Sequence, residues 1–209
     1  MRTPTGRRSL AVCAAFIVLA AHPGGTSTFD VHGTARVGGR PMANVAVWLE
    51  APSASAAPRA TAKIVLDQRN LNFAPHVLVV RVGTTVDFPN NDRVFHNVFS
   101  FRDGKRFDLG MYPVGALRHV TFDRPGLSRI FCNIHPNMAA YVMAVDTPYF
   151  GTTDTGGAFA IASVPAGSYT YHAWRPGAQE LTGPAVVGAS AASHNAEDLE
   201  NVSLAVEWR

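Results

Sequence analysis

The sequence lacks the sustained 3.6-residue hydrophobic periodicity of amphipathic helices, which excludes a helical bundle. Charge is scarce too: only 16% of the 209 residues are charged, whereas 47% are hydrophobic and supply enough material for a packed core. The net charge of +3 comes from the amino terminus, because residues 1–21 hold three arginines and no acid. Without them, 15 basic residues face 15 acidic ones, which removes any overall electrostatic basis for nucleic-acid binding.

The amino-terminal segment contains no apolar run long enough to span a bilayer comfortably. Its run from Leu10 to Ala21 covers about 12 residues, whereas a spanning helix needs about 20. Arg7 and Arg8 precede the run and small residues follow it, which is the pattern of an export signal. We therefore predict that residues 1–21 are a signal peptide, that the mature protein is periplasmic or secreted, and that no membrane span remains after cleavage. A retained anchor, and Sec or Tat as the export route, stay open.

Cysteine is nearly absent from the chain. Of the two cysteines, Cys13 lies inside the signal, so the mature protein keeps Cys132 alone. A single cysteine cannot close an internal disulfide, and a free thiol in an oxidising compartment is a liability unless something occupies it. Cys132 is therefore the most informative residue of the chain.

Short strand patterns separated by glycine and proline turns fill the rest of the sequence. Residues 45–50 alternate as in a half-buried strand, and two strands flank a turn at Val82-Gly83. Residues 151–159 and 165–169 are hairpin signals. Further strands are expected at 118–122, 128–132, 140–145, 185–187 and 204–206. This spacing predicts an all-β sandwich or barrel.

A concentrated set of metal-binding donors follows one of these strands. Cys132, His135 and Met138 have the spacing C-x2-H-x2-M, so one short loop brings a thiolate, an imidazole and a thioether together. His96 follows a turn 36 residues upstream, where a neighbouring strand end supplies a fourth donor. One thiolate, two imidazoles and a weak axial thioether are the donors of a blue-copper electron-transfer site, whereas zinc gains little from methionine.

Ordinary structural roles exist for each donor taken singly. Met138 alone reads as a core methionine, His96 as a turn histidine and Cys132 as a buried apolar thiol. Their conjunction in an exported chain with one cysteine favours metal binding. The sequence does not support an enzyme: a binuclear copper centre needs a second cysteine in the loop, multicopper oxidases add His-x-His pairs, and hydrolases of the G-x-S-x-G type need that motif, and none of these is present. The remaining histidines are scattered and receive no role.

Residues 62–146 resemble a cupredoxin, the fold of plastocyanin and amicyanin, with a ligand loop as short as that of amicyanin. The matching segments are Phe73-Ala74-Pro75, residues 82–88, Asn91-Asp92, His96-Asn97-Val98 and the loop after Cys132. The resemblance implies a Greek-key sandwich that binds one mononuclear copper ion through His96, Cys132, His135 and Met138. It further implies that Asn97 steadies the loop and that Pro136 stands beside a solvent-facing His135. Residues 107–112 and 146–150 resemble exported bacterial proteins of the methylamine-utilisation kind.

The flanking segments resemble two parts of a carboxypeptidase-regulatory-like, or transthyretin-like, sandwich. The first part covers residues 29–50 and the second covers residues 147–209, with a linker rich in alanine, serine and proline at 51–61. Neither part alone has enough strands for a stable sandwich. We therefore expect the cupredoxin-like domain to be inserted between strands of one small sandwich, with two independent appendages as the alternative.

Three functions are consistent with these features. The first is an exported electron carrier, in which Phe95, Phe99, Phe131 and Tyr141 form the apolar shell of the sulfur and a redox partner docks near His135. The second is a copper chaperone or store, which should exchange Cu(I) readily. The third is an interaction protein in which the split sandwich carries the function and copper is secondary. The sequence does not identify the partner, the reduction potential or the oligomeric state.

Overall fold

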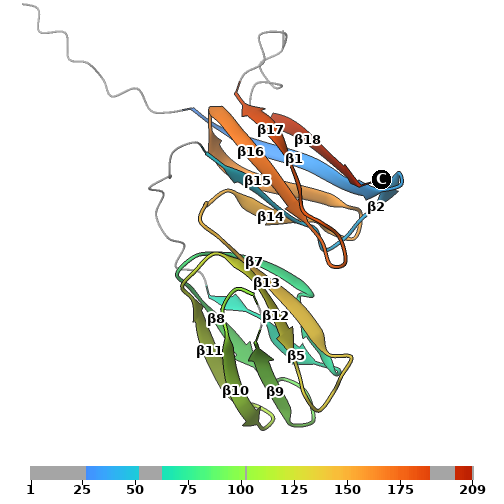
Figure 1. Cartoon of the computed structure of the whole chain (residues 1–209), viewed down its shortest axis with the longest axis vertical. Helices are drawn as coiled ribbons and strands as arrows, with labels where there is room; N and C mark the ends of the chain where they lie inside the picture. The colour runs from blue at the N-terminus through green and yellow to red at the C-terminus, as the bar shows by residue number, and fades with distance from the viewer. Residues whose placement is uncertain (1–26, 52–62, 102, 189–200, 209) are drawn as a thin grey trace, which may run out of the picture.

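The computed structural model describes residues 27–51, 63–101, 103–188 and 201–208. These residues form 18 β-strands and no helix, arranged as two β-sandwich domains joined end to end (Figure 1). The prediction of an all-β protein is confirmed. The described residues contain no helix that could cross a membrane. The predicted signal peptide (1–21) lies outside the described residues, as does the predicted linker (51–61) apart from its first residue.

One domain is built from a single segment of the chain, residues 64–145. It lies at the bottom of Figure 1, and we call it the lower domain. A five-stranded sheet, ordered β10-β9-β12-β13-β7, packs against a three-stranded sheet, ordered β11-β8-β4, and β5 and β6 form a separate hairpin. The strands are β4 (Ile64–Val65), β5 (Asp67–Arg69), β6 (Asn72–Ala74), β7 (Val77–Arg81), β8 (Thr84–Pro89), β9 (His96–Ser100), β10 (Phe107–Tyr112), β11 (Leu117–Phe122), β12 (Gly126–Phe131) and β13 (Ala139–Val145).

Alternating burial along these strands builds one core between the two sheets. In β8, Val86 and Phe88 are fully buried, while Asp87 between them is half-buried and Thr85 before them is exposed. The turn between β7 and β8 occurs where expected, because Gly83 has φ +88°, a backbone conformation that costs glycine little. Cys132 and Met138 belong to the same buried cluster as Phe88, so the loop that carries them is anchored in the core.

The other domain is assembled from two distant segments, residues 28–50 and 150–208. It lies at the top of Figure 1, and we call it the upper domain. In one sheet β1 lies between β15 and β18, with β2 paired to it, and in the other β3 lies between β14 and β16, with β17 at the edge. Strands that precede the lower domain are thus central in both sheets. The strands are β1 (Thr28–Val37), β2 (Arg40–Pro41), β3 (Ala46–Glu50), β14 (Phe150–Thr152), β15 (Ala158–Pro165), β16 (Gly167–Trp174), β17 (Leu181–Val187) and β18 (Asn201–Trp208).

The two hairpins expected after residue 150 are wrong. The turn at 153–157 joins β14, which pairs with β3, to β15, which pairs with β1. The turn at 166 joins β15 to β16, which pairs with β3 and β17. Both turns therefore connect the two sheets of the sandwich. Turn residues mark where the chain reverses, but they do not say which strand it will pair with next.

The prediction that residues 45–50 form a half-buried strand is wrong as well, because both faces of β3 are buried. Val47 and Leu49 face the core of the upper domain. Ala46 and Trp48 face the other way, into a cluster shared with β7, β13 and Trp174. This cluster forms the junction between the two domains, with Trp48 only 5% exposed.

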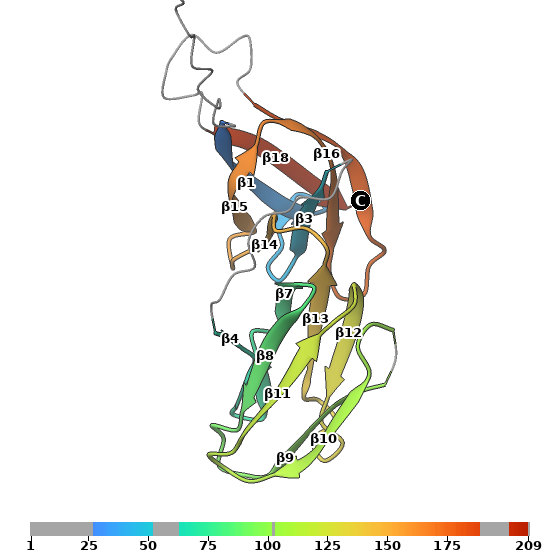
Figure 2. The same ribbon diagram turned by 90° about the vertical axis from the view of Figure 1, so that its left-hand side faces the viewer.

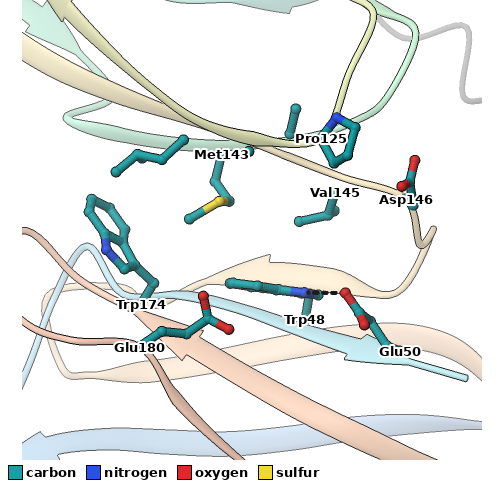
Figure 3. Close-up of a pocket in the computed structure, with 11 residues that line it drawn as sticks. Trp48, Glu50, Pro125, Met143, Val145, Asp146, Trp174 and Glu180 are labelled. Carbon is teal, nitrogen blue, oxygen red and sulfur yellow. Dashed lines mark hydrogen bonds between the residues drawn. The ribbon is translucent and has the colours of Figure 1, made fainter. Parts of the chain in front are cut away.

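A small cavity of about 280 Å³ lies at the junction. Trp48 and Trp174 line one side, and Met143 and Val145 line the opposite side (Figure 3). Both indoles are at least nine-tenths buried and His172 stacks on Trp48 at 5.0 Å, so little aromatic surface is open to a ligand. The cavity adjoins the end of β13 and the start of β12, whereas the loop from Cys132 to Met138 joins the opposite ends of the same two strands.

Candidate metal centre

Three of the four predicted donors, His96, Cys132 and His135, meet at the end of the lower domain that is remote from the junction. His96 is the first residue of β9, and Cys132 and His135 lie in the loop between β12 and β13. Phe131 in β12 pairs with Phe99 in β9, so the two sequence-distant segments are neighbours in one sheet. Figure 2 shows β9 and β10 at the end of the molecule farthest from β1, β15 and β18.

Three donor atoms converge on one point. The Nδ1 atoms of His96 and His135 are 3.1 Å apart, and the Cys132 Sγ lies 3.9 Å from the first and 3.7 Å from the second. Metal bonds of about 2.0 Å to nitrogen and 2.3 Å to sulfur, at angles of about 100–130°, separate such donors by about 3.1–3.9 Å. The cluster therefore fits a single metal ion held by two imidazoles and a thiolate.

Burial differs between the two histidines. His96 is fully buried, while His135 is half-buried and follows Ile134, which is 44% exposed. Cys132 is 4% exposed, so the thiol is shielded by the core and is the free cysteine of the described residues. The half-buried histidine is thus the donor that lies nearest to solvent.

The loop that carries three of the predicted ligands is closed by its own backbone. The Cys132 N–H donates to the Met138 carbonyl at 3.3 Å, and the Met138 N–H donates to the His135 carbonyl at 2.9 Å. Met138 is 1% exposed and shares a core cluster with Cys132. Its place beside the donors agrees with an axial thioether, which stays a prediction.

Asn97 and Pro136 are the two other predicted residues of the site. The buried Asn97 donates its Nδ2 to the Asp108 Oδ1 on β10 at 2.8 Å, so the hydrogen bond of this amide joins β9 to β10. Its Oδ1 is buried without a hydrogen-bond partner among the described residues. Pro136 is exposed next to His135. The part that either residue plays in steadying the loop stays a prediction.

The aromatic shell expected around the sulfur is not the one found. The core cluster that contains Cys132 and Met138 includes none of Phe95, Phe99, Phe131 and Tyr141. Phe99 and Phe131 pack against each other outside it at a tilt, with ring centroids 5.9 Å apart. Tyr141 packs against Trp174 at the junction, and Phe95 is 53% exposed. Strand alternation explains this: Val98 and Ile130 point inward, so their neighbours Phe99 and Phe131 point outward. The buried cluster instead contains Val98, Ile130, Tyr112, Phe88, Phe122 and Ala140.

A carboxylate contacts the buried histidine, and the sequence pattern gave it no role. The Asp92 Oδ2 lies 3.0 Å from the His96 Nε2, on the opposite side of the ring from the donor cluster. Burial alone would raise the pKa of Asp92, but hydrogen bonds from the Leu71 and Arg93 N–H groups and from His96 lower it to about 2. The one sequence feature that could have pointed to Asp92 is its position four residues before His96, a candidate ligand.

The other described histidines lie apart from the cluster. His76 is exposed, lies 3.1 Å from the Ala139 carbonyl through its Nδ1 and packs edge-on against Tyr141. His172, at the junction, lies between Glu50 and Glu180. Within the described part of the chain, His96, Cys132 and His135 are the group of histidine, cysteine and acidic donors close enough to share a metal.

No family model and no curated protein matches the chain. Among solved structures, a copper-containing nitrite reductase from Thermus scotoductus is 25% identical with a TM-score of 0.39, over 46% of this chain and 25% of the reductase. A purple cupredoxin from Nitrosopumilus maritimus is 28% identical with a TM-score of 0.36, over 40% of this chain and 99% of its own. A reduced amicyanin variant is 28% identical with a TM-score of 0.37, over 47% of this chain and 99% of its own.

These likenesses cover less than half of this chain, and the chain spans only a quarter of the reductase. Because these TM-scores are all below 0.5, the donor geometry itself carries the functional conclusion.

Proposed function

We propose that this protein is an exported one-electron carrier that binds one copper ion through His96, Cys132 and His135, with Met138 as a weak axial ligand. The convergence of one thiolate and two imidazoles is the observation that carries the proposal. Soft sulfur together with imidazole nitrogen suits copper in both oxidation states, and a bound copper ion would supply one-electron chemistry. The resemblance of residues 62–146 to cupredoxins supports the same assignment.

The protein's own contribution is to hold the donors still. His96 is fixed in a strand and fully buried, and two backbone hydrogen bonds close the loop from Cys132 to Met138. Donors that keep their places when the charge of the ion changes keep the reorganisation small, which favours fast electron transfer. A chaperone needs ligands that an exchanging partner can reach, so the buried His96 and Cys132 favour the carrier over the chaperone.

We propose that electrons enter and leave through His135. It is the most exposed of the three donors, and Ile134 and Pro136 beside it are exposed too. Val94 and Phe95, which precede His96, add further exposed apolar surface, at 40% and 53%. An apolar face around a half-buried ligand suits a transient protein partner, because it permits close approach without a strong charge pattern. The chain would thus act as a carrier between partners and not as an enzyme.

We propose that the upper domain is one carboxypeptidase-regulatory-like sandwich, made of residues 29–50 and 147–209, into which the cupredoxin-like domain is inserted. The placement of β1 and β3 at the centre of both sheets supports this organisation. The buried junction supports a role as a rigid mount, which holds the metal end away from whatever the upper domain binds. The likeness of residues 107–112 to exported methylamine-utilisation proteins agrees with a periplasmic or secreted location.

The decisive experiment is the visible absorption spectrum of protein expressed without residues 1–21 and oxidised with Cu(II). We expect an intense thiolate-to-copper band that disappears in Cys132→Ser and persists in Asn133→Ser, the matched change at the next residue. A colourless protein that still binds Cu(I) would contradict the carrier and favour the chaperone. Failure to bind copper in either oxidation state would overturn the metal assignment.

A further inference from the structure

Asp92 ties the buried histidine of the donor cluster to a separate part of the fold. It lies in the loop between β8 and β9 and is 9% exposed. Its Oδ2 accepts from the Leu71 N–H at 2.7 Å and lies 3.0 Å from the His96 Nε2, while its Oδ1 accepts from the Arg93 N–H at 2.8 Å. Two backbone donors and the His96 ring therefore surround one carboxylate, which leaves it little freedom to move.

The position of the carboxylate determines which nitrogen of His96 carries the proton. Backbone N–H groups donate to both oxygens of Asp92, Leu71 to Oδ2 and Arg93 to Oδ1, which is the arrangement that stabilises an ionised carboxylate. An ionised carboxylate can only accept hydrogen bonds, so the His96 Nε2 must be the protonated nitrogen. The His96 Nδ1, 3.9 Å from the Cys132 Sγ, is then left with a free lone pair directed at the donor cluster.

We propose that Asp92 is the positioning residue of the metal centre: it selects the His96 tautomer that can bind the ion, and its buried negative charge favours the oxidised ion over the reduced one. This inference rests on the copper site proposed above. Carboxylates that accept the second N–H of a metal-bound histidine fix the ring and increase its basicity.

The effect on the redox equilibrium has a definite sign. Reduction of a bound copper ion would take one electron from a partner and lower the charge of the ion from +2 to +1, with no proton transferred to His96 or Asp92. A fixed negative charge one imidazole ring away stabilises the +2 state more than the +1 state. Asp92 therefore lowers the reduction potential, and its neutralisation should raise it.

The same carboxylate connects the metal end to an exposed turn. Its Oδ2 bonds the backbone of Leu71, which is 48% exposed in the turn between β5 and β6. A substitution at Asp92 will therefore loosen this turn as well as the His96 ring. A test of the positioning role needs readouts at His96 and at the metal, because a stability change alone would not separate the two.

The test compares Asp92→Asn with Asp67→Asn. Asparagine keeps the size of the side chain and removes the charge. Asp67 is the matched control, because it is an acid on neighbouring β5 that is not one of the converging donors. Its Oδ1 accepts from the Asn91 Nδ2 at 2.8 Å and its Oδ2 pairs with Arg69 at 3.3 Å. Two measurements are made: nitrogen NMR of the imidazoles in copper-free protein, and the midpoint potential of copper-loaded protein.

We expect copper-free wild type to show His96 as the pure Nε2–H tautomer and Asp92→Asn to show a mixture. The ratio of Cu(II) to Cu(I) affinities should fall about tenfold in Asp92→Asn, which corresponds to a rise of about 59 mV for one electron. Asp67→Asn should change that ratio less than about twofold, because Asp67 is already ion-paired with Arg69 at 3.3 Å and the pair is partly screened by water.

An unchanged potential and an unchanged tautomer in Asp92→Asn would overturn the proposal. If that variant does not fold, copper-free wild type still decides, since an Nδ1–H tautomer at His96 would overturn it too. Failure of the copper site itself would look different, because wild type would then lack the thiolate-to-copper band.

Discussion

The strand pair β12–β13 ends in two regions that differ in what they bury. At one end, the loop from Cys132 to Met138 brings polar donors together and leaves apolar side chains such as Ile134 in solvent. At the other end, Met143 and Val145 join Trp48 and Trp174 in a closed apolar junction. Burial at the junction stabilises the fold, whereas the metal end keeps a reactive cluster and an accessible surface. Each end can therefore be altered with little effect on the other.

The largest effect is expected from Trp48→Ala at the junction. The change removes a 5%-exposed indole from the contact between the domains, together with its stacking on His172, and should lower the free energy of unfolding by about 3–5 kcal/mol. The copper band should stay at the wild-type wavelength. Chemical denaturation followed by fluorescence and by visible absorbance measures both.

Trp208→Ala is the matched control for that variant. Trp208 is 7% exposed in the core of the upper domain and is not part of the junction cluster. We expect this variant to destabilise the upper domain while both domains stay in contact. A shifted copper band in Trp48→Ala would show that the two ends are coupled.

The next largest effect is a loss of stability at high pH, caused by the ionisation of Tyr112 in the core of the lower domain. Tyr112 is fully buried, and burial raises its pKa to about 12. Its hydroxyl accepts from the Gln68 Nε2 at 2.6 Å and donates to the Phe88 carbonyl at 3.1 Å. Because the native pKa lies above the unfolded value of about 10, the associated stability is fully present below pH 10 and is lost as pH rises through 12.

Tyr112→Phe should remove that loss, which is on the order of 2–3 kcal/mol between pH 10 and 12. At pH 7 the same variant should be less stable by about 1–2 kcal/mol, because it loses a buried hydrogen bond. Denaturation at several pH values and the difference absorbance of phenolate measure the two parts. A Tyr112 that titrates near pH 10 would contradict the burial argument.

Most of the metal end could be predicted because its candidate ligands are close in the sequence. The contacts that depend on long-range packing could not be predicted. Cys132, His135 and Met138 lie within seven residues, so one loop was enough to place them together. His96 could be added because strand ends of one sheet are neighbours. The role of Asp92 was not readable, because its carboxylate is fixed by the Leu71 N–H from a hairpin 21 residues away.

At the junction, the alternation rule failed for a physical reason. Residues 45–49 are all apolar, and such a run is typical of a strand buried on both faces. The second face is covered by the lower domain, which the pattern of one strand cannot show. The shell around Cys132 was mispredicted in a related way, since Phe99 and Phe131 are adjacent to inward-facing positions and not at them.

A smaller effect is expected at the hairpin that Asp92 holds. Asn70 and Leu71 have φ values of +53° and +58°, and a leucine in this region is strained. Leu71→Gly creates an Asn-Gly turn suited to a two-residue hairpin and should raise the free energy of unfolding by about 1 kcal/mol. Thermal unfolding of the copper-free protein measures it.

Leu117→Gly supplies the control for the turn. Leu117 is exposed to a similar extent, at 46%, but lies in β11 and is not among the residues with positive φ. Glycine there should lower stability by about 0.5–1 kcal/mol. Equal losses in both variants would mean that the turn carries no relievable strain.

The smallest change in stability, and the sharpest test of the metal end as a contact surface, comes from Phe95→Ser. Phe95 is 53% exposed beside His96, so its loss should alter stability by less than about 0.5 kcal/mol. If two copies meet through this face, each loses apolar contact, and the electron self-exchange rate should fall about fivefold to tenfold. Line broadening in NMR of half-oxidised protein measures that rate without a known partner.

Phe101→Ser removes an equally exposed ring, at 52%, which stacks on Phe99 and packs at a tilt against Phe131 on the outer side of the sheet. A larger decrease in Phe101→Ser than in Phe95→Ser would place electron entry at Phe131, next to Cys132, and not at His135.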